Sequence, residues 1–342
     1  MTPDITLIIT NWNGEHLLRE CLPTLRRAVD FNKSHRYEVM VIDDCSNDDS
    51  LSMLAREFPW VRRERTPRNL GFQGANNYAA KLAEAPFIML LNNDIKLHAE
   101  ALHHLAGHVR EADFFAVSGR IYDFDETTFL YGNRGGYFRQ GHFSLYEKDL
   151  LDTSQTLFAC GGAMLVDRQR YLQLGGFDPL YHPLYYEEID LSYRAFKRGW
   201  KVLYEPDSIA YHKVRGTITR QKKLHQIQRI SARNNYLFVF KNILDRGMTR
   251  EFLFYIPWFL LRDLLRGRFR FWAAFIMALG RLPTALKGRR RERREARISD
   301  GTALSRINSG THDRKPARGK VAPTSASSPS RSRPRIVTDG PA

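Results

Sequence analysis

Cysteine is scarce in this 342-residue sequence, which contains three such residues. Cys21, Cys45 and Cys160 lie far apart and form no CxxC pair, so a disulfide framework is excluded and a reducing compartment is favoured. No apolar run approaches the roughly 20 residues needed to span a bilayer. The N-terminus lacks a basic segment followed by a long apolar core, so we expect no signal peptide.

Acidic residues are few towards the C-terminus. Residues 262–342 contain 20 Lys and Arg against 6 Asp and Glu, so most of the net charge of +16 lies there. The rest of the chain is close to neutral, which argues against nucleic-acid binding by the whole protein. The basic segment alone leaves one alternative open, a polyanion-binding protein that acts through its arginines.

Short apolar segments alternate with helical patterns along the first 210 residues. Strands are expected at 5–12, 37–44, 60–66, 87–91, 114–122 and 200–206, and residues 158–178 are expected to contain a further strand followed by a short helix. Helices are expected at 15–29, 50–58, 74–85, 99–111 and 187–199. This alternation predicts βαβ units, and therefore an α/β fold with a mainly parallel twisted sheet flanked by helices.

The composition divides the chain into three expected segments. Residues 1–230 carry the α/β pattern. Residues 231–287 are apolar and aromatic but are interrupted by Pro257 and several arginines, which favours amphipathic helices on an anionic membrane. A helical lid packed on the core is the alternative for this segment. Residues 288–342 are basic and rich in Ser and Pro, and we expect a disordered tail.

Polar residues stop the apolar run of one expected strand abruptly. In IMLLNNDIKLH, Asn92, Asn93 and Asp94 follow directly after Leu91. Ligands of open α/β sheets bind beyond the carboxyl ends of the strands. A carboxylate flanked by amides suits a hard cation such as Mg²⁺ or Mn²⁺. A polar turn that caps the next helix is the alternative.

Several polar segments occur in a characteristic order along the chain. They are TNWNG, IDDCSNDDS, RNLGFQGANNYA, NND, GGAMLVDRQRYLQLGGFDP, EEIDLSYRAFKRG and EPDSIAYH. This order resembles the family 2 glycosyltransferases, which have the GT-A fold, and more closely their bacterial rhamnosyl- and galactofuranosyltransferase branch. The resemblance covers about residues 5–214. It implies an inverting, metal-dependent transfer of a sugar from a nucleotide-sugar donor, with dTDP-rhamnose as a candidate, to a lipid-linked or cell-surface glycan.

The resemblance also implies residue roles on the donor side. The nucleotide-sugar donor would be bound by Thr10, Asn11, Asn13, Asp44, Asn69, Gly71, Gly74 and Asn93. Asp44 would accept a hydrogen bond from the base, since a carboxylate is an acceptor. A divalent metal, Mg²⁺ or Mn²⁺, would be bound by Asp94 with His212 and Asn92. Asn92 stands where the family's DXD motif has its first carboxylate.

On the acceptor side, the resemblance makes Glu188 the catalytic base, in a position where the family usually has aspartate. Gly161, Gly162 and Glu187 would lie beside the acceptor. Asp190 is expected to stabilise the N-terminus of its helix.

Two other classes of protein are alternatives to a glycosyltransferase. A dinucleotide-binding oxidoreductase is disfavoured, because no GxGxxG follows the first strand. A non-catalytic member of the fold that binds glycans or nucleotides is the alternative, and the presence of Asp94, Glu188 and His212 together argues against it. We expect the protein to be cytoplasmic and peripheral on the inner face of the plasma membrane.

Overall fold

The structure, a computed structural model, describes residues 2–149, 151–213, 224–267 and 269–309. Its strands are β1 (Ile5–Asn11), β2 (Tyr37–Asp43), β3 (Arg62–Arg65), β4 (Phe87–Asn92), β5 (Ile95–Leu97), β6 (Phe114–Asp123), β7 (Phe129–Tyr131), β8 (Arg134–Arg139), β9 (His142–Glu147), β10 (Ser154–Gln155), β11 (Ala163–Asp167) and β12 (Lys201–His212). Its helices are α1 (Glu15–Phe31), α2 (Ser50–Glu57), α3 (Gly71–Leu82), α4 (Ala101–Ala106), α5 (Arg168–Leu174), α6 (Glu187–Lys197), α8 (Leu224–Asn242), α9 (Arg246–Leu265), α10 (Arg270–Leu279), α11 (Leu282–Glu295) and α12 (Asp300–Asn308), with 3-10 turns η1 (Gly107–Arg110) and η2 (Pro179–Tyr181).

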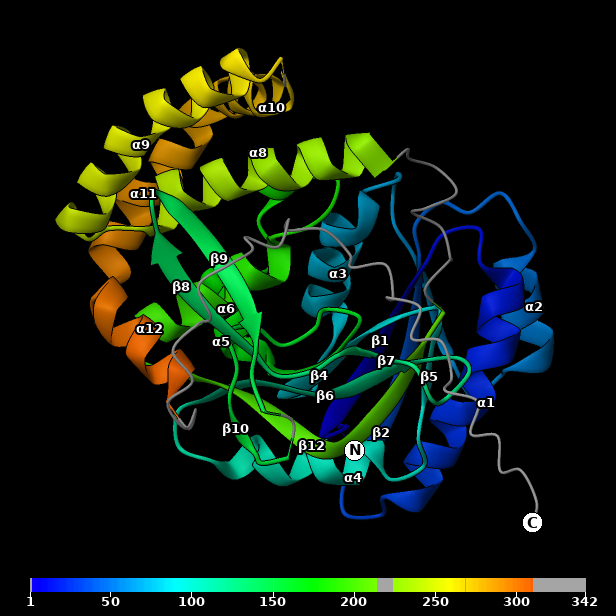
Figure 1. Ribbon diagram of the computed structural model, residues 1–342. Coiled ribbons are helices and arrows are strands. Elements are labelled where there is room, and N and C mark those ends of the chain that lie inside the picture. The colour runs from blue at the N-terminus through cyan, green and yellow to red at the C-terminus, as the bar shows by residue number, and fades with distance from the viewer. Residues whose placement is uncertain (1, 150, 214–223, 268, 310–342) are drawn as a thin grey trace, which may run out of the picture.

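A ten-stranded sheet forms the middle layer, and helices cover both of its faces (Figure 1). The strand order is β10-β12-β6-β11-β4-β1-β2-β3, with β5 paired to β12 and β7 to β6. β1 is parallel to both β2 and β4, and β12 is parallel to β6, whereas β11 is antiparallel to its two neighbours. The expected α/β fold with a mainly parallel sheet is therefore confirmed.

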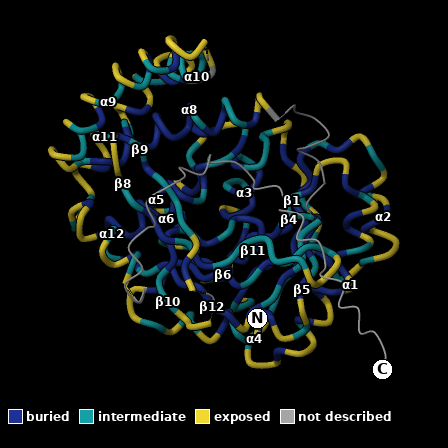
Figure 2. Tube along the Cα trace, viewed as in Figure 1, coloured by how far each residue is buried: buried dark blue, intermediate teal, exposed yellow. Residues whose placement is uncertain are grey.

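Side chains of the central strands alternate between two apolar clusters. Ile8 of β1 packs in the cluster that contains residues of α3, α5 and α6, whereas Leu7 and Ile9 pack in the cluster with α1, α2 and α4. Successive side chains of a strand point to opposite faces, so a strand covered on both faces must be apolar at every position. This explains the unbroken apolar run of β4, and the buried core in Figure 2 follows these strands.

Helices α8, α9, α10 and α11 lie together, away from α1 and α4 (Figure 1). α10 and α11 pack on α8, and α12 contacts α6 and β8. The expected boundary between residues 230 and 231 falls inside α8, so this helix belongs to both expected segments. No helix within the described ranges has the length and hydropathy needed to cross a bilayer.

The expectation of a disordered chain from residue 288 onward is wrong for residues 288–309, which contain the end of α11 and all of α12. Arg198, just after α6, forms ion pairs with Glu292 and Glu295, and Lys197 bonds Asp300 at 2.5 Å. The segment RRRERREAR has no apolar stripe, so its composition did not indicate that its carboxylates meet buried cations from far earlier in the chain. Residues 310–342 lie outside the described residues.

Replacement of Asp300 by alanine should destabilise the fold strongly. Its buried carboxylate accepts hydrogen bonds from Lys197 and from the Tyr193 hydroxyl at 2.9 Å. Removing one partner of a buried ion pair leaves an uncompensated charge and costs about 3–5 kcal/mol. The exposed pair of Asp30 with Arg26 provides a control, because Asp30→Ala should cost less than about 1 kcal/mol. Urea denaturation measures both values, and equal costs would contradict the structural role of α12.

Candidate active site

The carboxyl ends of β1, β2 and β4 meet at one edge of the sheet. Thr10 of β1 is in register with Ile42 of β2 and with Asn92 of β4. The polar residues that follow these strands are therefore neighbours in space. This edge is where open α/β sheets bind their ligands.

Asn11 links the loops at this edge. Its side-chain amide donates to Oδ1 of Asp43 at 3.2 Å and to Oγ of Ser50 at 3.0 Å. Its own Oδ1 accepts from Nδ2 of Asn93 at 2.8 Å. Gly14 must lack a side chain here, since a Cβ would lie 2.1 Å from that Nδ2. Asn11 and Asn93 therefore fix the ends of the first and fourth strands to each other, with Asn11 itself buried.

The carboxylate of Asp44 organises the start of α3. It accepts hydrogen bonds from Oγ1 of Thr66 (2.8 Å) and from the backbone N–H groups of Leu70 (2.7 Å) and Gly71 (2.8 Å). Nδ2 of Asn69 donates to the backbone carbonyl of Asp44 at 3.1 Å. The structure thus brings together the candidate donor residues at 44, 69 and 71. The hydrogen bonds from Thr66, Leu70 and Gly71 therefore occupy three acceptor positions of the Asp44 carboxylate.

Asn13 and Gly74, two further donor-side candidates, have structural roles in the loops near Asp44. Asn13 has a φ of 52°, and its Oδ1 accepts from the N–H of Asn47 at 2.7 Å, which holds the β1–α1 and β2–α2 loops together. A Cβ on Gly74 would lie 2.7 Å from Cβ of Leu70. Packing at the start of α3 therefore requires glycine at this position.

Asn92, Asp94 and His212 form the candidate metal centre. β5 pairs with the end of β12 so that His212 is opposite Ile95, and Nε2 of His212 lies 3.3 Å from Oδ1 of Asp94. This Oδ1 and Oδ1 of Asn92 are buried and have no hydrogen-bond partner among the described residues. Buried oxygen atoms without a donor are uncommon unless water or an ion satisfies them. This set of oxygen and nitrogen atoms therefore fits a divalent cation.

A second group with metal-ligand chemistry consists of His104, Glu205 and Asp207. The Glu205 carboxylate lies 2.7 Å from the His108 ring and accepts from the N–H of Asp207 at 2.9 Å. Protein donors thus satisfy this carboxylate, unlike the oxygen of Asp94. The unsatisfied set at the sheet edge is the better metal candidate.

The side chain of Glu188, in the first turn of α6, covers Gly161. A Cβ on Gly161 would lie 2.7 Å from Cγ and 2.9 Å from Oε1 of Glu188. The carbonyl of the next residue, Gly162, accepts from the N–H of Asn92 at 3.0 Å. The two glycines therefore connect the base candidate to the metal candidates within one short segment.

Glu187 and Glu188 are both hard to ionise. Burial raises the pKa of Glu188, and burial together with the charge of Glu188 raises the pKa of Glu187 well above its usual value of 4.5. Oε2 of Glu187 is buried with no hydrogen-bond partner among the residues that the structure describes. A carboxylate whose pKa is moved towards neutrality suits proton transfer, and the two groups titrate as a pair.

Helix α8 holds the loop before Glu187, which the sequence analysis did not predict. Nδ2 of Asn234 donates to three loop carbonyls, those of Tyr181 (3.0 Å), Leu184 (2.9 Å) and Tyr185 (2.8 Å). Tyr185 and Tyr186 have positive φ angles of 67° and 78°. Such backbone persists only where surrounding contacts fix it. The sequence does contain one indication of this contact. Asn234 and Asn235 interrupt an apolar helical pattern, and buried amides need hydrogen-bond partners.

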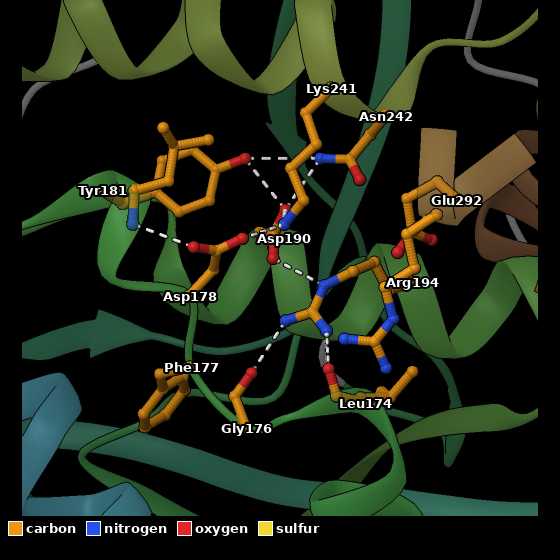
Figure 3. Close-up of polar contacts among 12 residues, drawn as sticks. Leu174, Gly176, Phe177, Asp178, Tyr181, Asp190, Arg194, Lys241, Asn242 and Glu292 are labelled. Carbon is orange, nitrogen blue, oxygen red and sulfur yellow. Dashed lines mark hydrogen bonds and ion pairs between the residues drawn. The ribbon is translucent and has the colours of Figure 1, made fainter. Parts of the chain in front are cut away.

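Asp190 has a larger role than the expected stabilisation of the helix N-terminus. Its fully buried carboxylate bonds Arg194 (2.6 Å), Lys241 (2.7 Å), Asn242 (2.8 Å) and the Tyr181 hydroxyl (2.8 Å), as Figure 3 shows. Burial alone would raise its pKa, but the charges of Arg194 and Lys241 hold the pKa of Asp190 well below its usual range. This cluster joins α6 to α8 beside the base candidate.

Residues 6–174 match the family model described as Glycosyl transferase family 2. The chain therefore contains a glycosyltransferase domain of this family, as its motifs predicted. It is 27% identical over 240 residues to N-acetylgalactosaminyltransferase 6 of Drosophila melanogaster, covering 64% of this chain and 35% of the relative. It is 27% identical over 210 residues to N-acetylglucosaminyl-diphospho-decaprenol L-rhamnosyltransferase of Mycobacterium tuberculosis (strain ATCC 25618 / H37Rv), covering 52% and 67%. The chain spans about a third of the length of the Drosophila relative.

Solved structures confirm the GT-A fold. GalNAc-T7 with UDP, GalNAc and Mn²⁺ gives a TM-score of 0.54 at 16% identity, covering 73% of this chain and 50% of that one. TarS 1-349 of S. aureus in complex with UDP-GlcNAc gives 0.55 at 16% identity, covering 86% and 84%.

Substitution of Asp94 by asparagine should weaken Mn²⁺ binding by more than about tenfold, the lower bound for losing an outer-sphere partner. The change keeps the shape of the side chain but removes its charge. Calorimetric titration of the protein with Mn²⁺ measures the effect. Asp49→Asn, at an exposed carboxylate just before α2 that makes no capping bond, is the control and should bind like the parent. Equal affinities of parent and Asp94→Asn would contradict the metal assignment.

Proposed function

We propose that this chain transfers a sugar, with inversion at the anomeric carbon, from a nucleotide-sugar donor to a hydroxyl group of a glycan. The observation that carries the proposal is the contact of Glu188 with Gly161, one residue before the Gly162 carbonyl that bonds Asn92. A group able to accept a proton thus adjoins a ligand set for a divalent ion. Inverting transfer uses both, one at the attacking oxygen and one at the leaving group.

The donor would lie along the loops after β1, β2 and β4. Asp94, His212 and Asn92 would hold a divalent ion, Mg²⁺ or Mn²⁺. Such an ion, when bound, stabilises the charge of the departing nucleoside diphosphate. The Mn²⁺ in the GalNAc-T7 structure supports a divalent cofactor. Asn13, at the start of the β1–α1 turn, and Asn69 with Gly71, at the start of α3, would face the nucleotide.

Glu188 would take the proton of the acceptor hydroxyl as its oxygen attacks. Glu187 is 5% exposed and therefore lies deeper than the half-buried Glu188. This difference in exposure favours Glu188 as the group that reaches the acceptor. Its raised pKa makes it a stronger base than an exposed glutamate.

The donor sugar and acceptor are inferred from relatives. The name of the M. tuberculosis relative gives an L-rhamnosyl group and a diphospho-decaprenol acceptor. We therefore favour dTDP-rhamnose as donor and a lipid-linked or cell-surface glycan as acceptor. The UDP-GlcNAc bound to TarS makes a UDP-sugar the alternative donor.

A membrane-facing helix would suit a lipid-linked acceptor. α9 exposes an apolar stripe at helical spacing, Phe254, Trp258, Leu261 and Leu265, with exposed fractions of 75%, 55%, 48% and 77%. A helix that covers a hydrophobic core turns its apolar stripe towards that core. The apolar stripe of α9 faces solvent instead. Arg262 lies beside this stripe and Arg266 follows the last residue of α9, as expected for contact with anionic lipid. The stripe supports our proposal that the protein is cytoplasmic and peripheral on the inner face of the plasma membrane.

Glu188→Gln should reduce kcat by about 10²–10⁴-fold, the usual effect of losing a positioned base. Donor affinity should be unchanged, since the amide keeps the size of the side chain. In the parent, kcat/KM should rise with pH through a pKa above 4.5, because burial raises the pKa of the base and only its ionised form accepts a proton.

Glu100→Gln, at an exposed glutamate before α4, is the matched control and should transfer sugar at the parental rate. Release of nucleoside diphosphate by the parent separates an enzyme from a protein that only binds glycans or nucleotides. Near-parental turnover of Glu188→Gln would overturn the assignment of the base.

Replacing the stripe should release the protein from vesicles. Burial of a Phe or Leu side chain contributes roughly 1.5–3 kcal/mol, so Phe254→Ser with Leu265→Ser should weaken binding to vesicles by more than about 100-fold. Leu151→Ser, at a residue that is 73% exposed outside the C-terminal helices, is the control and should bind like the parent. Flotation of the protein with lipid vesicles measures the difference, and unchanged flotation of the α9 variant would refute membrane contact through this helix.

A further inference from the structure

A cavity of about 530 Å³ lies between α11 and the turn that joins α5 to η2. Gly175, Gly176 and Asp178 line it on the side of the turn, and Arg194 and Lys241 reach it from α6 and α8. Figure 3 shows part of this wall, where Asp178, Arg194, Lys241 and Glu292 converge. None of these residues belongs to the catalytic edge of the sheet.

The carboxylates that line the cavity already have cationic partners. Asp178 bonds Lys241 at 2.6 Å. Glu292 is paired with Arg198, and Glu295 with both Arg198 and Arg291, the latter at 2.9 Å. No lining carboxylate is therefore free to neutralise a further cation.

Three further cations of the lining have no such partner. Lys287, Arg290 and Arg294 occupy positions i, i+3 and i+7 of α11, and so share one face of the helix. All three are exposed, and within the described part of the chain they form no hydrogen bond or ion pair. The cavity therefore carries excess positive charge beside open donors. Guanidinium groups in this arrangement match the oxygen atoms of a phosphate.

An apolar cavity of about 500 Å³ adjoins this site and shares Lys287 and Arg290 with it. Its other lining residues are Leu279, Leu282, Pro283 and Leu286. Leu279 and Leu286 are 42% and 41% exposed. A free phosphate ion would gain nothing from these side chains, whereas a phosphate attached to a hydrocarbon chain would cover them.

We propose that this face of α11 binds the phosphate group of an anionic phospholipid, with Arg290 and Arg294 on the phosphate and the leucines against the lipid chain. The inference rests on the membrane attachment proposed above, to which it adds a binding site on α11 for the phosphate group of one lipid molecule. It does not depend on sugar transfer.

The test compares binding of the full chain to vesicles of phosphatidylcholine with and without phosphatidylglycerol, in the absence of any donor. Each arginine near an anionic surface contributes about 1 kcal/mol, so Arg290→Gln with Arg294→Gln should lower affinity for the phosphatidylglycerol vesicles by about 30-fold. The matched control is Arg27→Gln with Arg110→Gln, which removes the same charge from two exposed arginines of α1 and η1 without ion pairs in the described residues. The control should lose less than about threefold, since these sites lie outside the C-terminal helices. Both double variants should keep the parental melting temperature.

Three results would overturn the proposal. An equal loss in the control pair would mean that binding reflects net charge alone. Equal affinity of the parent for vesicles with and without phosphatidylglycerol would show that the site does not select anionic lipid. Binding of inorganic phosphate that is lost in the α11 variant, without any difference in vesicle binding, would make this a site for free phosphate. Because no donor is present, failure of the proposed sugar transfer would leave all of these readings unchanged.

Discussion

The buried carboxylate of Asp190 fixes the helix of the base candidate relative to the C-terminal helices. It accepts hydrogen bonds from donors in α6, η2 and α8. A buried charge is tolerated only when it is fully paired, so loss of one donor would leave the negative charge of Asp190 incompletely compensated. These elements therefore keep one relative position, and Glu188, two residues before Asp190, is placed by the same bonds.

The central strands and most helices were predictable, because both faces of the sheet are covered and its strands are apolar throughout. Three-residue β5 was not, since it is too short to show periodicity. Yet its pairing with β12 is what sets His212 beside Asp94. Both residues were predicted as metal ligands from the resemblance to the family. Their separation in the sequence does not by itself indicate that they are in contact.

The sequence patterns did not predict the contacts between polar residues that are far apart in the chain. The bonds of Asn11 to Asn93, and of Asp44 to Gly71, join residues that the motifs had named separately. Their mutual hydrogen bonds are a property of the folded loops and leave no periodic pattern in the sequence. The same applies to Glu292 in α11, whose buried partner is Arg198. Composition suggested disorder there because it counts charges without regard to which of them meet.

The match to the family ends at residue 174, whereas Glu188 and the Asn234 amide that holds its loop lie beyond it. The family model therefore ends before the base candidate and before the helix whose amide holds the adjacent loop. In a chimaera joined at residue 174, one parent would supply the strand ends that carry Asp44 and Asp94, and the other would supply Glu188 and His212. Helix α8 would then come from the same parent as the loop that it holds, so the position of Glu188 and the packing of α10 and α11 would depend on one parent alone.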